Sequence, residues 1–94
     1  MKNPIVLAEA DNETCAYNLS GKLIGKKVND SIEVYRFGKT YNYIQNENSW
    51  DIKSAGKHIG KLEYDGVEYK FTKNKFNPFS YNRLNDIFMA LNNN

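Results

Sequence analysis

A unit of about 35 residues is written twice in this chain. Ser20–Lys26 (Ser-Gly-Lys-Leu-Ile-Gly-Lys) returns as Ala55–Lys61 (Ala-Gly-Lys-His-Ile-Gly-Lys), and Asp30–Glu33 returns in the same register as Asp65–Glu68. Repeats at a fixed spacing indicate duplicated supersecondary units that bury their apolar faces against each other. The repeat therefore constrains the architecture more than any other feature of the sequence.

The length and composition fit one folded domain. A chain of 94 residues can bury roughly two-thirds of its unfolded surface, and seven Tyr and five Phe supply bulky side chains for a core. We therefore expect a single domain over residues 1–94, with the two copies at about 20–54 and 55–89. The net charge of +2 is nearly balanced, whereas nucleic-acid and membrane binders usually carry a larger basic excess.

The segments between turn signals are short and rich in aromatic and β-branched residues, which favours strands. In the second copy, Trp50 and Ile52 alternate with polar residues, and Asp65-Gly66 predicts a two-residue hairpin turn. Val67, Tyr69 and Phe71 then alternate with polar residues as in a half-buried strand. The second copy thus reads as a three-stranded meander.

The first copy repeats this plan. Cys15, Tyr17 and Leu19 are in phase and predict one apolar strand face, and a strand is also expected over Pro4 to Glu9. Gly25 and Gly60 fall inside expected strands, where a glycine marks a β-bulge or a close approach of the backbone.

The C-terminal segment predicts a helix. Ser80 is a suitable N-cap, and one apolar stripe follows at Leu84, Ile87, Phe88 and Leu91. The expected fold is therefore α+β and mainly antiparallel β. The duplicated three-stranded meanders form a curved sheet or a small barrel, and one C-terminal amphipathic helix covers an open face or end.

The sequence contains few side chains that could serve in catalysis or bind a metal. His58 is the sole histidine, and its counterpart in the first copy is Leu23, which favours a packing or edge position. Cys15 and His58 would form a thiol–imidazole pair only if the fold brought them together, and we interpret Cys15 as a small buried hydrophobe. One Cys and one His cannot assemble a structural zinc site. Because the sequence also lacks a catalytic constellation, we expect no enzyme activity, metal or cofactor.

Lysines cluster in the repeated segment of both copies: two of the three in the first copy have counterparts in the second. If the two hairpins lay side by side, these amines would line one edge, with tyrosine rings nearby for base stacking. Lysines also serve simply to solvate exposed strands and to discourage edge pairing, which is the interpretation we favour. The residues of this nucleic-acid alternative are Lys22, Lys26, Lys27, Lys57 and Lys61.

The leading expectation is a small non-enzymatic binding module that acts by protein–protein contact. Exposed tyrosines would carry the contact, because Tyr combines a large rigid ring with a polar tip; we expect Tyr41, Tyr43 and Tyr64 in this role. A single cysteine favours a reduced, cytoplasmic setting. The excess of Lys and Asn is typical of low-GC bacteria and their phages, so we expect an accessory or inhibitor protein of such a source.

Overall fold

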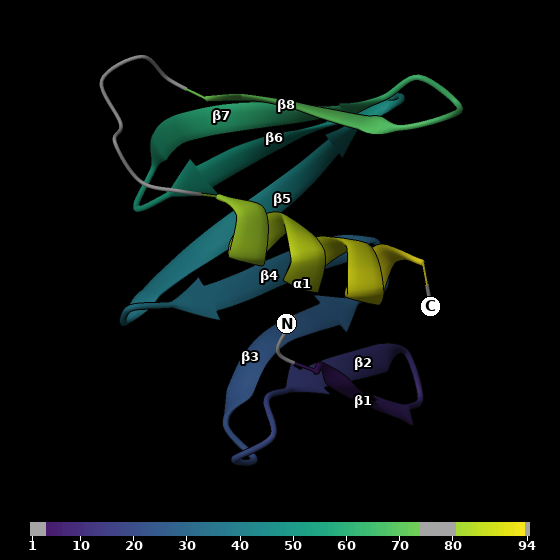
Figure 1. Ribbon diagram of the computed structural model, residues 1–94, viewed down its shortest axis with the longest axis vertical. Coiled ribbons are helices and arrows are strands. Elements are labelled where there is room, and N and C mark those ends of the chain that lie inside the picture. The colour runs from purple at the N-terminus through teal and green to yellow at the C-terminus, as the bar shows by residue number, and fades with distance from the viewer. Residues whose placement is uncertain (1–3, 74–80, 94) are drawn as a thin grey trace.

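The computed structural model describes residues 4–73 and 81–93, and its main element is an antiparallel sheet of eight strands (Figure 1). Each strand pairs with the next one along the chain, so the spatial order is the sequence order. The strands are β1 (Val6–Ala10), β2 (Glu13–Tyr17), β3 (Leu23–Val28), β4 (Ser31–Arg36), β5 (Lys39–Asn46), β6 (Ser49–Ser54), β7 (Lys57–Tyr64) and β8 (Tyr69–Lys73). The expected α+β class, mainly antiparallel, is confirmed. The described part of the sheet is not closed into a barrel, since β1 and β8 are its two edges.

The helix α1 (Asn82–Asn92) lies across one face of the sheet, here called the inner face (Figure 1). The predicted apolar stripe is confirmed, because Leu84, Ile87, Phe88 and Leu91 are all buried. Tyr81 stands at the start of the helix without a capping hydrogen bond from its side chain, and the predicted N-cap Ser80 lies outside the described residues.

Aromatic rings form the centre of the core between α1 and the sheet. The Phe88 ring stacks on Tyr43 of β5 with a centroid distance of 4.4 Å, and Trp50 of β6 meets it edge-on at 5.0 Å. The Tyr43 hydroxyl donates a hydrogen bond of 2.8 Å to Oδ1 of the buried Asn85. Tyr43 and Tyr41 are only 2% and 5% exposed, so the prediction that these two tyrosines lie on the surface is wrong. Alternation along β5 turns both rings toward the helix.

The predicted bulges are present at matching positions of the two copies. Ala16 and Tyr17 of β2 oppose Gly25 and Leu23, which leaves Ile24 as the extra residue of β3. Ile59 is the extra residue of β7 in the same way.

Both strand glycines also mark close approaches. A Cβ at Gly25 would lie 2.9 Å from Cγ2 of Ile87 in α1. One at Gly60 would lie 2.7 Å from the carbonyl oxygen of Thr72. A side chain at either position would therefore force neighbouring atoms to shift, which favours glycine.

The β7–β8 connection differs from the expected two-residue turn. Tyr64 pairs with Tyr69, so the loop has four residues, Asp65–Glu68. The Asp65 carboxylate accepts hydrogen bonds from the backbone N–H groups of Val67 (2.8 Å) and Glu68 (2.9 Å), which stabilises the wider loop. Val67 is 87% exposed at its tip instead of lying in the strand, and the matching segment Asp30–Glu33 lies partly within β4.

The phase predicted for β2 is also wrong. Ala16 is its fully buried residue, whereas Cys15 is half-buried and points to the outer face, and Leu19 is exposed in the loop that follows. Ala16 pairs with Gly25, where a Cβ would meet Ile87 and Leu91 of α1, so the inner position of β2 lies beside the helix and suits a small residue.

Candidate functional site

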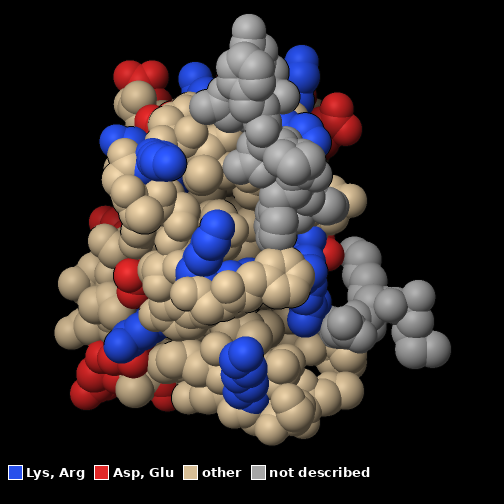
Figure 2. All heavy atoms as spheres, turned by 90° about the vertical axis from the view of Figure 1, so that its left-hand side faces the viewer, with Lys and Arg blue, Asp and Glu red and all other residues tan. Residues whose placement is uncertain are grey.

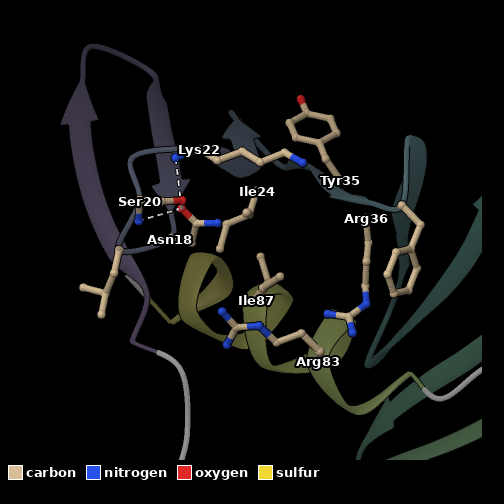
Figure 3. A pocket seen from close by; sticks show the side chains of 10 residues that line it. Asn18, Ser20, Lys22, Ile24, Tyr35, Arg36, Arg83 and Ile87 are labelled. Carbon is tan, nitrogen blue, oxygen red and sulfur yellow. Dashed lines mark hydrogen bonds between the residues drawn. The ribbon is translucent and has the colours of Figure 1, made fainter.

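A hollow of about 430 Å³ opens where the end of β4, the start of α1 and the loop after β2 meet (Figure 3). We call it the arginine pocket. Its lining residues are Asn18, Leu19, Ser20, Lys22, Ile24, Tyr35, Arg36, Phe37, Arg83 and Ile87. Its volume falls in the range of small-ligand pockets, roughly 300–1,000 Å³.

The arginine pocket brings three cations together from three separate segments. Lys22 comes from the β2–β3 loop, Arg36 from the end of β4 and Arg83 from the first turn of α1. No acidic side chain of the described residues lines the pocket. The sequence contains eleven lysines and only two arginines, and both arginines are here.

The surface around this region is mainly basic at its centre. Figure 2 shows the side of the molecule on which β4 ends and α1 begins. Basic side chains are spread over the middle of this side, and acidic side chains lie toward its margins. Lys26 forms an ion pair with Glu13, and His58 lies beside Asp51; both pairs are on the sheet, outside the arginine pocket.

Arg36 reaches from β4 toward the helix, as Figure 3 shows. Its Nε is buried and has no hydrogen-bond partner among the described residues. A buried polar group left in this state costs about 1–3 kcal/mol, and more when it is charged. The guanidinium carbon lies 4.7 Å from the centroid of the Phe37 ring, a cation–π contact that offsets part of this cost.

Arg83 lies near the N-terminus of α1, the end of a helix that disfavours a cation. The first turn of α1 carries no acidic residue, and the partial charge of a helix N-terminus is positive. The helix therefore adds to the positive potential of the arginine pocket.

The loop that carries Lys22 is held by one side chain. Oδ1 of Asn18 accepts hydrogen bonds from the backbone N–H of Ser20 (3.0 Å), the Ser20 hydroxyl (2.7 Å) and the backbone N–H of Lys22 (3.0 Å), two of them dashed in Figure 3. Such an Asx-type arrangement fixes a tight turn and thereby the point from which the lysine extends.

Two exposed apolar side chains form the rim of the arginine pocket. Leu19 is 73% exposed and Phe37 is 71% exposed. Phe37 and Gly38 form the two-residue β4–β5 turn with φ values of 53° and 73°. Such turns strongly prefer Asn or Asp before Gly, because a bulky residue is strained at positive φ. A strained residue whose side chain is exposed suggests a function outside the fold.

Tyr35 lines the upper edge of the pocket, and Figure 3 shows its hydroxyl pointing away from the helix and the two arginines. Burial and a hydrogen bond of 3.1 Å donated to Oε1 of Glu33 raise the pKa of Tyr35 to about 12. The phenol is protonated at neutral pH, as an ordinary tyrosine also is, and carries no charge beside the pocket.

Of the lysines proposed from the sequence, only Lys22 lines the arginine pocket. Lys26 and Lys27 lie on β3, and Lys57 and Lys61 lie on β7, with three strands between them in the sheet order. Neither strand is an edge of the sheet, so the five amines do not line one edge as the hypothesis required.

Lys26 has a partner on the neighbouring strand. Its Nζ lies 3.3 Å from Oε1 of Glu13, and the Cys15 thiol donates to the same oxygen at 3.2 Å. These hydrogen bonds, with the Cys15 bond as the largest cause, lower the pKa of Glu13, whereas burial mainly raises the pKa of Cys15. The raised thiol pKa opposes a role as nucleophile.

The remaining candidates from the sequence are separated. Tyr64 is the one predicted partner-binding tyrosine that reaches the surface, at 38% exposure, and its ring packs on Tyr69 at 4.7 Å. His58 lies on β7 with Nε2 3.2 Å from Oδ1 of Asp51, and four strands separate it from Cys15 on β2. Within residues 4–73 and 81–93, no three metal-ligating side chains gather.

Comparisons with known proteins add no relative: the sequence matches no family model, and no curated protein or solved structure shows significant similarity to it. No helix in the described part of the chain has the length and apolar character that crossing a membrane requires. The functional interpretation therefore depends on the geometry of the arginine pocket.

Sequence reasoning missed four residues of this pocket: Leu19, Arg36, Phe37 and Arg83. Two signals were present for three of them: arginine is rare in this lysine-rich chain, and Phe-Gly is an unusual turn pair. The folding of the chain was needed to place the two arginines together.

Proposed function

We propose that the protein is a small non-enzymatic module that binds another protein through the arginine pocket and its rim. The observation that carries this proposal is Phe37, an exposed aromatic ring at a strained turn position beside the pocket. Large apolar side chains that project beside polar groups are typical anchors of protein interfaces, among which aromatic residues and Arg are enriched.

The proposal replaces the expected tyrosine surface with a different one. Tyr41 and Tyr43 are core residues, whereas Leu19 and Phe37 present apolar area next to Lys22, Arg36 and Arg83. Tyr64 remains exposed on β7 and is not part of the arginine pocket.

Nucleic-acid binding is the second candidate, and its support is the basic character of the face in Figure 2. The spread of the proposed lysines over β3 and β7 argues against a continuous basic groove. A nucleic-acid complex would weaken steeply with added salt, because each neutralised phosphate releases counterions.

The test is affinity capture from a nuclease-treated lysate of the native host. We compare the parent with a Leu19→Ser/Phe37→Ser variant, and with Val67→Ser as the matched control, because Val67 is a similarly exposed apolar residue on the distant β7–β8 loop. The same protein should be retained by the parent and by Val67→Ser, and lost with the double variant.

If the parent, Val67→Ser and the double variant retained the partner equally, Leu19 and Phe37 would not belong to the interface. In a parallel capture without nuclease, DNA or RNA that is retained at physiological salt and lost with Lys27→Glu/Lys61→Glu would promote the second candidate. Lys26→Glu is a poorer probe, because it would place a carboxylate beside Glu13 and destabilise the sheet.

The biological setting is part of the same proposal. A single cysteine without a disulfide partner in the sequence suits a reducing cytoplasm. The small size and the Lys- and Asn-rich composition support an accessory or inhibitor protein of a low-GC bacterium or its phage.

A further inference from the structure

The chemistry of the arginine pocket indicates what kind of group it accepts. Arginine presents a planar guanidinium whose parallel N–H groups match the two oxygens of a carboxylate, whereas lysine acts as a point charge. Both arginines of a chain with eleven lysines line this pocket, and a lysine is the third cation. The Nε of Arg36 is buried and has no hydrogen-bond acceptor among the described residues.

We propose that the arginine pocket receives an aspartate or glutamate side chain of the partner. The acidic residue belongs to a peptide segment whose apolar neighbours pack on Leu19 and Phe37. This inference rests on the proposed function and deepens it, because it names the chemistry that the partner presents.

Charge and shape complementarity favour an acidic peptide over other anions. The three cations are confined to one hollow, and exposed apolar side chains flank it, so the matching surface is one acidic group between apolar ones. A nucleic-acid strand would instead need cations along its length and free ring faces for stacking.

The two arginines make a direct test possible. A ¹⁵N-labelled sample gives one side-chain Nε–Hε signal for each arginine, and Arg36→Lys and Arg83→Lys assign the two signals while keeping the charge. The probe is a terminally blocked tetrapeptide of leucine, two glutamates and phenylalanine. Its control replaces both glutamates by glutamine, and inorganic phosphate is titrated separately.

The acidic peptide should move both arginine signals in a saturable way and bind at least about tenfold more tightly than the glutamine peptide. Phe37→Ala should weaken the acidic peptide and leave both signals observable. Equal binding of the two peptides, or no movement of either arginine signal, would overturn the inference. Tighter binding of phosphate than of the acidic peptide would overturn the choice of a carboxylate.

Different results would disprove the acidic-side-chain inference and the proposed protein-binding function. If capture of the partner is lost with Leu19→Ser/Phe37→Ser but survives Arg36→Gln/Arg83→Gln, protein binding stands and the acidic side chain is wrong. If the acidic peptide binds but no host protein is retained, the carboxylate site stands and the protein-binding function is wrong.

Discussion

Replacing Phe37 by asparagine should separate the stability of the protein from its binding. Phe37 occupies the first position of a two-residue turn at φ 53°, where Asn is favoured and an ordinary side chain costs about 1–2 kcal/mol. The substitution removes this strain. It also removes the cation–π contact with Arg36, which at an exposed site contributes about 0.5–1 kcal/mol.

The apolar area lost is small. The residue is 71% exposed, so less than a third of a ring surface of roughly 200 Å² is buried, which stabilises by about 1.5 kcal/mol at most. Gain and losses nearly cancel, and we expect the free energy of unfolding to change by about 1 kcal/mol or less. Urea unfolding measures this change, and the capture assay should show that Phe37→Asn no longer retains the partner.

Ala55 provides a matched control. Ala55 and Gly56 form the β6–β7 turn with φ values of 52° and 79°, nearly the same backbone as Phe37 and Gly38. Ala55→Asn relieves the same strain without losing a ring, so it should raise the free energy of unfolding by about 1 kcal/mol and leave capture unchanged. A loss above about 2 kcal/mol for Phe37→Asn would refute the reasoning, because the ring would then be a structural residue.

Three further substitutions test the fold. Phe88→Ala should lower the free energy of unfolding by roughly 3–5 kcal/mol in urea, because its ring stacks on Tyr43, and a loss below about 1 kcal/mol would contradict the core. Burial raises the pKa of Tyr43 well above its usual range, so above pH about 10 the unfolded chain loses a proton that the folded chain keeps, and stability falls as pH rises. Tyr43→Phe should flatten this alkaline decline in urea titrations, and an unchanged slope would show that Tyr43 titrates normally. Hydrogen bonds from the backbone N–H groups of Glu68 and Val67 lower the pKa of Asp65, so the carboxylate stabilises the fold at neutral pH and loses this effect in acid. Asp65→Ala should therefore destabilise the protein at pH 7 and not at pH 2. Equal destabilisation at the two pH values would exclude a stabilising role of the loop contact.

The sheet could be predicted from the sequence because it depends on short-range features of the chain. Every strand pairs with its chain neighbour, so the alternation of Trp50 and Ile52 and the punctuation by turn residues suffice to draw it. The strand glycines Gly25 and Gly60 predicted two bulges that the structure contains. The helix followed from its apolar stripe in the same way.

The predictions of burial were wrong where a segment distant in the sequence determines which side chain is buried. The alternation of Tyr41 and Tyr43 was visible, but their hydroxyls suggested exposure. Asn85 supplies the acceptor that allows Tyr43 to be buried, and it lies far along the chain. The inner face of β2 is set by the approach of α1 to Gly25, which selects Ala16 over Cys15.

The candidate site depends on tertiary placement even more. Arg36 and Arg83 share a pocket only because α1 returns across the end of β4. From composition alone, the scarcity of arginine indicates only a low-GC source. The functional hypothesis depends on where the fold places the two arginines.

The packing of the helix and the geometry of the arginine pocket are coupled through Ile87, which lines the pocket and contacts Gly25. A Cβ at Gly25 would lie 2.9 Å from Cγ2 of Ile87, closer than carbon atoms approach, so Gly25→Ala must displace α1 or the strand. Arg83 lies one turn before Ile87 on the same helix and should move with it.

We therefore expect Gly25→Ala to lower the free energy of unfolding and to shift the Nε–Hε signal of Arg83 without any ligand. Ile87→Ala removes the clashing methyl group, so the double variant should be less destabilised than the sum of the single variants by at least about 0.5 kcal/mol. Val67→Ala, on the distant loop, should leave the Arg83 signal in place. An unchanged Arg83 signal in a destabilised Gly25→Ala protein would show that the helix and the pocket respond independently, and that the strand, not α1, absorbs the added methyl group.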